Sequence, residues 1–392
     1  MLIQISKSEM IKPIPYGRQY ISEADIEAVK ETLLSDFLTQ GPKITEFEEK
    51  FASYIGSRFA VAVSNGTAAL HLSMMALGVD TDTNVIVSPI TFAADGNCVR
   101  YCGGNVYFAD INPETFNLDI NSVKKLIESK PEGFFSGVIA VDFAGRPMEL
   151  DLLRALTEEN DMWIVEDACH APGGHFFDLN EKKHNCGSGY FAELAVFSFH
   201  PVKHIATGEG GMITTNNTQL YEKLKLLRTH GITKDPALMT ENHGGWYMEM
   251  IELGYNYRMP DILAALGISQ LAKADTNMQR RQELAQRYNK AFENTPVKTP
   301  KPMGNGLHAY HLYVIQVENR KGLYNHLQAN QIYAQVHYVP MHLMPYYKNM
   351  GFKEGDYPVS EAYYSRCLSL PMYPSLTDEQ QDYVIEKILE FV

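Results

Sequence analysis

Lys203 is the residue of this sequence best placed to act as a nucleophile. It lies between an apolar run, 194–199, and the glycine-rich segment 208–211, after which residues 212–215 indicate another strand. A lysine held between two strands is partly desolvated, and desolvation lowers the pKa of an ammonium group because it disfavours the charged form. A neutral amine can attack a carbonyl carbon and form a Schiff base. Since most single lysines are exposed surface residues, this chemistry depends on what surrounds Lys203.

Two adjacent acids mark a second place where chemistry is possible. Glu166 and Asp167 follow the apolar run 162–165, which indicates the carboxyl end of a buried strand. Successive side chains of a strand point to opposite faces, so one acid can serve a site while the other makes a structural bond. A carboxylate at that depth needs a cationic or N–H partner. His170 can line the same cavity; the alternative is a surface acid pair followed by a hydrogen-bonded histidine.

A strand–turn–helix pattern suits an anion. Strand 59–63 is followed by a short turn and a helix over 68–77, which places Gly66 and Thr67 at the helix N-terminus. Free N–H groups and the helix dipole bind phosphate at such a position, and a glycine lets the anion approach closely. An ordinary capped turn fits the same residues, so the pattern alone leaves both interpretations open.

Short apolar strands alternate with helices over residues 20–230, which predicts an α/β fold with a mostly parallel sheet and helices on both faces. Phe92 follows strand 84–89, at the end of the sheet where ligands bind in open α/β folds. Its ring would stack on a flat ligand or pack in the core. We predict a large domain over residues 1–265, which includes an N-terminal arm, and a smaller C-terminal α/β domain over residues 266–392. A long helix from residue 261 to about residue 294 is expected to join them.

Composition excludes several classes of function. The net charge is −13 and no run is rich in lysine or arginine, which argues against nucleic acid or an anionic membrane as a partner. No apolar run approaches the roughly 18 residues of a membrane span, and the first ten residues lack the pattern of a signal peptide. The number of cysteines is odd and their spacing does not match a zinc site, which favours reduced thiols, a cytoplasmic location and no metal; they are Cys98, Cys102, Cys169, Cys186 and Cys367.

One ligand would use all of these groups together. Pyridoxal 5′-phosphate has a phosphate, a flat ring, a basic ring nitrogen and an aldehyde, and a lysine Schiff base with an acid on the ring nitrogen is its expected signature. Lys203, once released, would be the base that moves a proton between two carbon atoms of the substrate–cofactor adduct. The corresponding contacts are Gly66, Thr67 and Ser198 for the phosphate, Phe92 for the ring, Asp167 for the nitrogen and Lys203 for the aldehyde.

The chain resembles the DegT/DnrJ/EryC1/StrS family of sugar aminotransferases, and the resemblance extends over nearly its whole length. It implies the pyridoxal-phosphate-dependent fold type I, which is the fold of aspartate aminotransferase. The matching segments are LTQG (38–41), SNGTAAL (64–70), EDACHA (166–171), FSFHPVK (197–203), GEGG (208–211), RTHG (228–231) and GYNYRM (254–259).

Within the family the sequence is similar to the PseC-type branch, which acts in pseudaminic acid synthesis. His170, the segment FHPVK (199–203) and the segment QVHY (335–338) carry this similarity. It implies amino transfer from L-glutamate to the C4 ketone of a UDP-linked 2-acetamido-2,6-dideoxy-hexos-4-ulose, with His170 beside the cofactor. It further implies a homodimer in which Asn256 reaches the cofactor phosphate of the neighbouring subunit. The implied nucleotide-sugar contacts are Tyr16, Asp36, Phe37, Leu38, Thr39, His337, Tyr338, Val339 and Pro340.

Three alternatives remain at this point. Relatives in the family act on dTDP-4-keto-6-deoxyglucose or on 3-keto sugars, and the shared motifs do not separate these acceptors. Dehydratases of the family carry histidine at the lysine position, but the spacing from Ser198 places Lys203 there and His204 one residue beyond. A regulator that binds the cofactor without turnover usually carries a DNA-binding helix-turn-helix, for which 392 residues leave no room. The polar segment 173–190 has no role in any of these interpretations.

Overall fold

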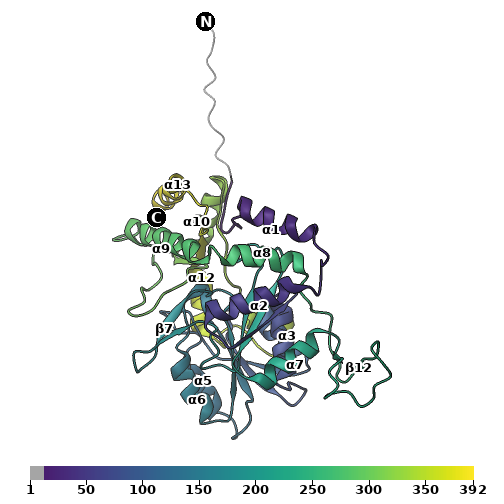
Figure 1. Ribbon diagram of the computed structural model, residues 1–392. Coiled ribbons are helices and arrows are strands. Elements are labelled where there is room, and N and C mark those ends of the chain that lie inside the picture. Colours follow the sequence, from purple (N-terminus) through teal and green to yellow (C-terminus); the bar gives the residue numbers. More distant parts are fainter. Residues whose placement is uncertain (1–12) are drawn as a thin grey trace.

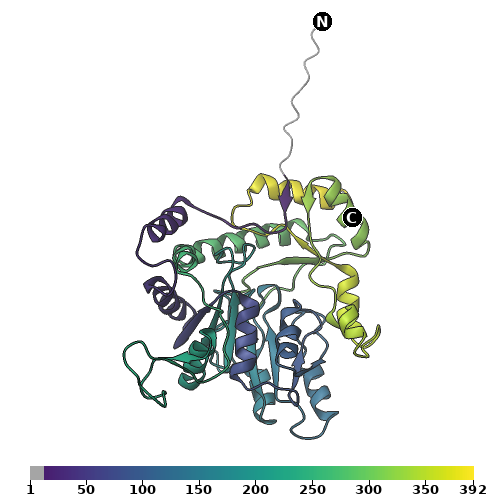
Figure 2. The same cartoon turned by 90° about the vertical axis from the view of Figure 1, so that its right-hand side faces the viewer.

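The structure is a computed structural model that describes residues 13–392. The first ten residues, on which the prediction about a signal peptide depends, lie outside the described residues. Within residues 13–392 no helix combines the length and the apolar character needed to cross a bilayer. The ribbon shows a sheet with helices on both sides and, above one end of it, a smaller group of elements from the C-terminal part of the chain (Figures 1 and 2).

A seven-stranded sheet forms the centre of the molecule. Its strand order is β2-β10-β9-β6-β5-β3-β4. Strand β10 runs antiparallel to its neighbours β2 and β9, and the four remaining pairings are parallel. The predicted mostly parallel sheet is therefore confirmed. The strands are β2 (Phe59–Val63), β3 (Asn84–Val87), β4 (Asn105–Phe108), β5 (Gly137–Val141), β6 (Trp163–Asp167), β9 (Leu194–Ser198) and β10 (Gly211–Thr215).

Alternation along each strand decides which helices cover each face of the sheet. In β2, Val61 and Val63 pack with α3, α4 and α7, whereas Ala60 and Ala62 pack with α2 and α8. Helices α5 and α6 cover the second face further along, against β5 and β6. Because both faces are buried, the strands are continuous apolar runs. The helices are α2 (Pro42–Ile55), α3 (Gly66–Ala76), α4 (Ala94–Tyr101), α5 (Ile120–Glu128), α6 (Leu150–Glu158), α7 (Thr218–Arg228) and α8 (Asp261–Leu271).

The C-terminal part has its own apolar core around β13 (Tyr313–Gln316) and β15 (Cys367–Leu370), which pair antiparallel. The N-terminal arm joins this core, because β1 (Ile14–Pro15) pairs parallel with β14 (Ile332–Tyr333) and Ile14 is buried there. The boundary predicted between residues 265 and 266 falls inside α8, and the division into two domains stays a prediction. The helices of this part are α9 (Ala274–Ala291), α10 (Arg320–Ala329), α11 (Pro345–Lys348), α12 (Pro358–Arg366) and α13 (Asp378–Leu389), with a short 3-10 turn at Met341–Leu343. Another 3-10 turn follows β5 at Phe143–Gly145.

The prediction of one helix over residues 261–294 was wrong. The segment is divided into α8 and α9, and Lys273 lies at the break with its backbone outside the helical region. The Lys273 ammonium donates hydrogen bonds to the Tyr20 carbonyl oxygen at 3.1 Å and to the Asp25 carboxylate near the start of α1 (Glu23–Leu33). This contact between segments distant in sequence provides a physical reason for the break.

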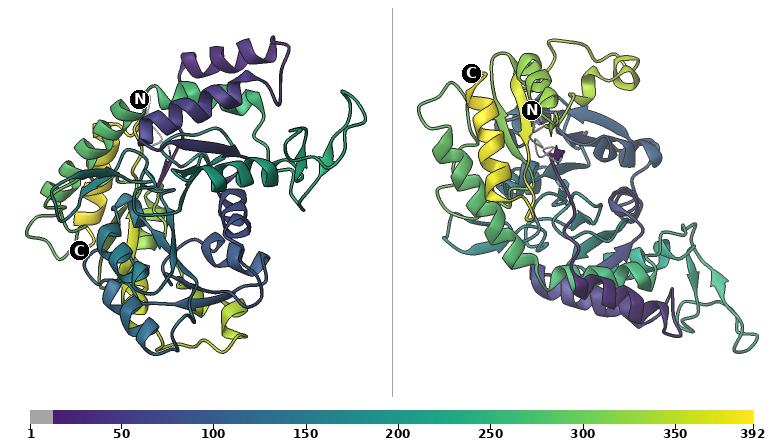
Figure 3. Two further views of the ribbon diagram at one scale, coloured as in Figure 1. Left: turned by 60° about the horizontal axis from the view of Figure 1, so that its bottom comes forward. Right: turned by 90° about the horizontal axis from the view of Figure 1, so that it is seen from above.

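Two segments without a predicted role have defined structures. Residues 173–190 contain the hairpin β7 (His175–Phe177) and β8 (Lys183–Asn185), and the backbone of His175 also pairs with Leu307. The loop-rich segment 231–255 contains the short pair β11 (Ile232–Thr233) and β12 (Glu249–Met250) and projects from the body of the molecule (Figures 1 and 3).

Candidate active site

A cavity of about 730 Å³ lies at the carboxyl ends of the central strands, between the sheet and the C-terminal part of the chain. Turns after β2, β3 and β9 and the last residue of β6 reach it, because the carboxyl ends of these strands lie at one edge of the sheet. Residues that line it include Tyr16, Asn65, Gly66, Thr67, Thr91, Phe92, Asp167, Cys169, His170, Ser198, His200, Lys203, Glu209, Tyr257, His311, His337 and Tyr338.

The cavity brings together most of the residues predicted to bind the cofactor, which are Gly66, Thr67, Phe92, Asp167, His170, Ser198 and Lys203. Three residues predicted to bind the sugar also line it: Tyr16, His337 and Tyr338. Asn256 does not line it; this residue is exposed and its backbone pairs with Thr229. The other predicted sugar contacts also lie outside the cavity. They are the exposed loop residues between α1 and α2, which are Asp36, Phe37, Leu38 and Thr39, and the two residues after Tyr338, which are Val339 and Pro340.

Lys203 follows β9 in a turn closed by its own backbone, since the Lys203 N–H donates to the His200 carbonyl oxygen at 2.8 Å. Its side chain lines the cavity, and among residues 13–392 its Nζ atom has no hydrogen-bond partner. Burial lowers the pKa of Lys203, and the nearby Cys169, Asp167 and Asp95 only partly oppose this shift. The amine is therefore available for bonding to a carbonyl carbon.

Asp167 ends β6, is 7% exposed and faces the cavity. Its Oδ1 atom accepts a hydrogen bond from the Cys169 N–H at 2.9 Å. This bond fixes the orientation of the carboxylate, because the donor belongs to the turn that directly follows the strand. The carboxylate can therefore accept a further hydrogen bond from a ligand in the cavity.

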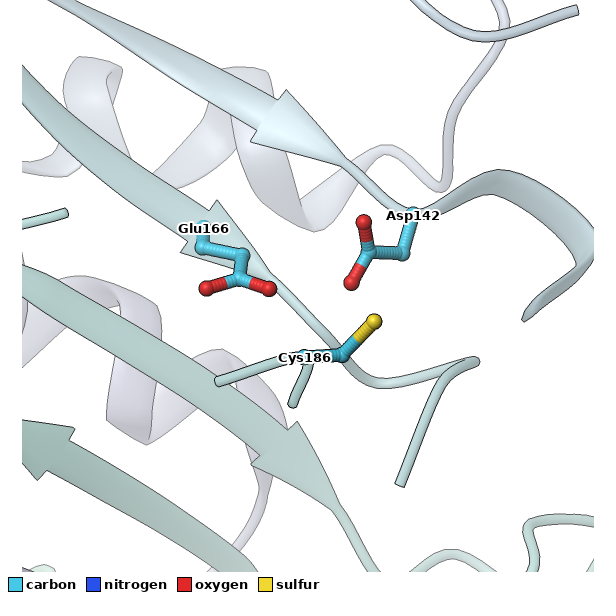
Figure 4. A group of neighbouring side chains, drawn as sticks. All are labelled: Asp142, Glu166 and Cys186. Atoms are coloured by element: carbon cyan, nitrogen blue, oxygen red, sulfur yellow. The ribbon is translucent and has the colours of Figure 1, made fainter. Parts of the chain in front are cut away.

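Glu166 points to the other face of the sheet, as the alternation along the strand predicts. There it lies beside Asp142 and Cys186, and the ligand-type atoms of the three residues are within 4.8 Å of one another (Figure 4). Backbone N–H groups of Gly187 and Met148 donate to the two acids at 2.7 Å. Burial raises the pKa of all three groups, that of Asp142 to about 7. Protonation keeps these buried groups uncharged. Because Cys186 and Gly187 belong to segment 173–190, their contacts with the two acids attach this segment to the sheet.

The turn after β2 has the geometry of an anion site. Asn65 caps α3 by accepting the Ala68 N–H at 2.8 Å. The N–H groups of Gly66 and Thr67 belong to the first turn of the helix, where no intrahelical acceptor exists. A Cβ atom on Gly66 would stand 3.0 Å from Cβ of Ser198, so glycine permits the end of β9 to approach this turn. Backbone donors at a helix N-terminus suit a phosphate group.

Phe92 is 60% exposed and lines the cavity, so the alternative of a core phenylalanine is wrong. Its ring centroid is 6.2 Å from that of Tyr338. An aromatic face left open in a cavity offers a stacking surface for a flat ring.

His170 is a buried residue of the cavity lining. Its Nδ1 atom accepts the Ala144 N–H at 3.2 Å, so a neutral ring carries its proton on Nε2, which lies 3.5 Å from the Tyr338 hydroxyl. The His311 ring lies against it, with centroids 4.3 Å apart. Burial is the main reason that the pKa of both histidines falls well below the usual value. Two neutral imidazoles therefore border the cavity near Lys203.

Tyr16 and His337 also line the cavity, with ring centroids 5.1 Å apart. Nδ1 of His337 is 2.8 Å from the Ser369 hydroxyl, and burial lowers the pKa of His337 to about 3. This histidine is neutral near pH 7 and offers hydrogen bonding without charge.

Several lining residues had no predicted role, among them Thr91, His200, Glu209, Tyr257 and His311. His200, Glu209 and Tyr257 belong to the segments 197–203, 208–211 and 254–259 that carried the family resemblance, and their positions there were the available signal. His311 comes from the C-terminal part of the chain, and no local pattern connects it with Lys203.

The residues present fit pyridoxal 5′-phosphate. A helix N-terminus suits its phosphate, an open phenyl ring suits its pyridine, an oriented carboxylate suits its ring nitrogen and a free amine suits its aldehyde. All four features line a single cavity.

Comparisons with known proteins agree with this chemistry. The model of the DegT/DnrJ/EryC1/StrS aminotransferase family matches residues 19–389. Spore coat polysaccharide biosynthesis protein SpsC of Bacillus subtilis is 37% identical over 388 residues, which cover 97% of each chain. UDP-4-amino-4,6-dideoxy-N-acetyl-beta-L-altrosamine transaminase of Campylobacter jejuni is 34% identical over 385 residues, again 97% of each. The structure of Helicobacter pylori PseC, an aminotransferase involved in the biosynthesis of pseudoaminic acid, superposes with a TM-score of 0.87 at 30% identity and covers 97% of this chain and 99% of that one.

Proposed function

The chain belongs to the DegT/DnrJ/EryC1/StrS aminotransferase family, and we propose that it transfers the amino group of L-glutamate to the C4 ketone of a UDP-linked 2-acetamido-2,6-dideoxy-hexos-4-ulose in pseudaminic acid biosynthesis. At the level of the family it is an aminotransferase of nucleotide sugars that uses pyridoxal 5′-phosphate. The observation that carries the proposal is the single cavity in which the free Lys203 amine lies with Asp167 and the anion-binding turn at Gly66.

Each proposed residue has a defined task. Pyridoxal 5′-phosphate, when bound, supplies an aldehyde that exchanges for the amino group and a ring that stabilises negative charge on the adjacent carbon. Lys203 is the base that moves a proton between the two carbon atoms that flank the transferred amino nitrogen. An amine with a lowered pKa suits this task. Asp167 accepts the hydrogen bond of the protonated ring nitrogen. The N–H groups of Gly66 and Thr67, with the Ser198 hydroxyl, hold the phosphate.

His170 and Phe92 complete the proposed cofactor site. The neutral His170 ring can donate a hydrogen bond from Nε2 without adding charge, and the open ring of Phe92 would cover one face of the pyridine. Tyr16, His337 and Tyr338 would contact the sugar, because they line the same cavity and come from the N-terminal arm and the C-terminal part of the chain, not from the sheet.

The acceptor is proposed from two similarities. The Campylobacter jejuni relative is named for a UDP-linked 4-amino sugar, and the Helicobacter pylori structure for a role in pseudoaminic acid synthesis. Both similarities cover at least 97% of this chain, so the segments that would contact the sugar are included.

We also propose that the active unit is a homodimer with shared sites. Phe37 and Leu38 are 52% and 46% exposed, and Trp246 in the projecting segment is 76% exposed. Apolar side chains in such positions favour contact with another protein surface. In a second subunit these loops would reach the cavity of the first, with Asn256 at the cofactor phosphate and residues from Asp36 to Thr39 near the nucleotide-sugar. Val339 and Pro340 directly follow Tyr338, which lines the cavity of its own chain, and would contact the nucleotide-sugar from there.

A complementation experiment tests the shared sites. Lys203→Ala and Asn256→Ala variants are each expected to be inactive, whereas a mixed dimer has one site with both residues intact. Recovery of activity after the two variants are mixed and reassembled supports the proposal. If the mixture stays inactive while wild-type subunits survive the same treatment, the sites are not shared.

The substrate test separates the two half-reactions. The protein is loaded with pyridoxal 5′-phosphate and treated with L-glutamate, which should convert the cofactor to its amino form and abolish its visible absorption band. Candidate 4-keto and 3-keto sugars are then added one at a time. Return of the band with the UDP-linked 4-keto-hexosamine, and formation of its 4-amino product by mass spectrometry, is the expected result. A response to dTDP-4-keto-6-deoxyglucose alone would replace the proposed acceptor.

A further inference from the structure

A second carboxyl group, that of Asp95, lies next to Asp167. Asp95 belongs to the first turn of α4 and is 1% exposed. One of its oxygen atoms, Oδ2, accepts a hydrogen bond from the Thr91 hydroxyl, and within the described residues its other oxygen, Oδ1, is buried without a partner. Thr91, which donates to Asp95, lines the same cavity as Asp167, and the two carboxyl groups are close enough to interact electrostatically.

Two ionised carboxylates cannot share such a place at low cost. Both would be acceptors, so no bond could form between them, and their charges would repel at short range in a poorly solvated environment. The buried Oδ1 atom of Asp95 would also stay without a donor. A proton on one of the two acids removes all three penalties, as in other pairs of adjacent carboxyl groups.

The surroundings favour Asp95 over Asp167 as the acid that retains this proton. Asp167 has a backbone donor at 2.9 Å and faces the cavity, whereas Asp95 receives only the Thr91 hydroxyl and is nearly inaccessible. Burial raises the pKa of Asp95 well above its usual value, and the charge of Asp167 raises it further, against opposing effects of Thr91 and Lys203. The titratable groups that interact electrostatically with Asp95 are Asp167, Lys203, Cys98, Cys169, Tyr338 and Tyr347.

We propose that Asp95 is a neutral carboxylic acid that donates a hydrogen bond to the Asp167 carboxylate, so that the pair carries one negative charge. Asp95 is a positioning residue, because it acts through Asp167. The donated bond orients the Asp167 carboxylate, which remains an acceptor for a protonated ring nitrogen that it contacts. This consequence rests on the proposed function, whereas the shared charge of the two acids does not.

The first test uses the cofactor-free protein and infrared spectroscopy near pH 7. A protonated carboxylic acid and a carboxylate absorb at different frequencies, so the difference between wild type and Asp95→Asn shows which form Asp95 has. Loss of a carboxylic acid band is expected. Loss of carboxylate bands instead would overturn the proposal. Asp142→Asn is a positive control, because burial raises the pKa of Asp142 to about 7 and its replacement should also remove part of a carboxylic acid band.

The second test uses the loaded enzyme. Asp95→Asn keeps a neutral donor of the same shape, so its kcat should remain within about threefold of wild type. Asp95→Leu removes the donor, and the loss of a hydrogen bond to a charged group, about 1.5–3 kcal/mol, corresponds to a roughly tenfold to hundredfold lower kcat. The KM for glutamate should change little, and the pH at which the cofactor spectrum changes should shift in Asp95→Leu alone. Unchanged kcat and spectrum in Asp95→Leu would exclude a role for Asp95 through Asp167.

The two tests distinguish the possible failures. If no amino transfer is found but the carboxylic acid band depends on Asp95, the proposed function fails and the shared proton stands. If amino transfer occurs and the band does not depend on Asp95, only the inference about Asp95 fails.

Discussion

Gly66, at the start of α3, lies so close to Ser198, at the end of β9, that a Cβ atom on Gly66 would stand 3.0 Å from Cβ and 3.3 Å from Oγ of Ser198. The helix N-terminus and the serine hydroxyl thus converge on one point of the cavity. This approach is possible because glycine has no side chain, and it makes the turn suitable for a phosphate group.

Gly66→Ala should therefore weaken cofactor binding. The added methyl group has to displace Ser198 or the helix N-terminus, both of which are proposed to hold the phosphate. The dissociation constant for pyridoxal 5′-phosphate, measured by fluorescence titration, should rise at least roughly tenfold, the equivalent of about 1.4 kcal/mol. Gly304→Ala is the control, since a Cβ atom there has no neighbour within 4 Å. Equal affinity in Gly66→Ala and wild type would separate this turn from the phosphate.

Lys203→Ala should abolish covalent attachment of the cofactor. Lys203 is the lysine that lines the cavity, so no other amine of the described chain is placed to bond to the aldehyde there. Borohydride reduction followed by mass spectrometry should show the adduct in wild type and in the surface variant Lys223→Ala but not in Lys203→Ala. A reducible adduct that persists in the variant would refute the assignment of Lys203.

Asp167→Asn should retain the cofactor and lose most of the turnover. The amide oxygen can still accept the Cys169 N–H, so the local structure should persist. A neutral amide no longer stabilises a protonated ring nitrogen, and kcat should fall roughly 100-fold or more, the scale of a lost proton-holding group. Single-turnover kinetics of the glutamate half-reaction measure this effect, with the exposed Asp161→Asn as control. Near-normal rates would remove Asp167 from the mechanism.

The buried acid Asp142 should make the free energy of unfolding depend on pH. Burial raises its pKa to about 7 in the folded state, above the value of about 3.9 expected in the unfolded chain. The folded state therefore holds more protons between these values, and stability falls as pH rises from about 4 to about 7, by up to about 1.4 kcal/mol per pH unit for one group.

Urea titrations across that pH range would measure the slope. Asp142→Asn keeps an acceptor for the Met148 N–H at 2.7 Å and should reduce the slope, although Glu166, whose pKa burial also raises, keeps part of it. A slope that is identical in wild type and Asp142→Asn would show that Asp142 is ionised in the folded protein.

The order of residues by itself predicted the mostly parallel sheet, and it placed Gly66, Asp167 and Lys203 after strands of that sheet. Apolar strands, helix starts and the motifs around Asp167 and Lys203 are local patterns, and local patterns follow from the periodicity of buried and exposed side chains. Because parallel strands end at one edge of a sheet, the positions of these residues after their strands also implied that they meet.

Only the tertiary structure decided the rest of the site. His311 and Asp95 approach Asp167 and Lys203 from segments separated by many residues, and neither has a local signal that indicates this neighbourhood. At the break between α8 and α9, Lys273 donates a hydrogen bond to Asp25, and the helical periodicity of the segment does not predict this contact. The physical reason is the same in each case: a contact between distant segments depends on how whole elements pack, whereas the sequence pattern reports the environment of each element separately.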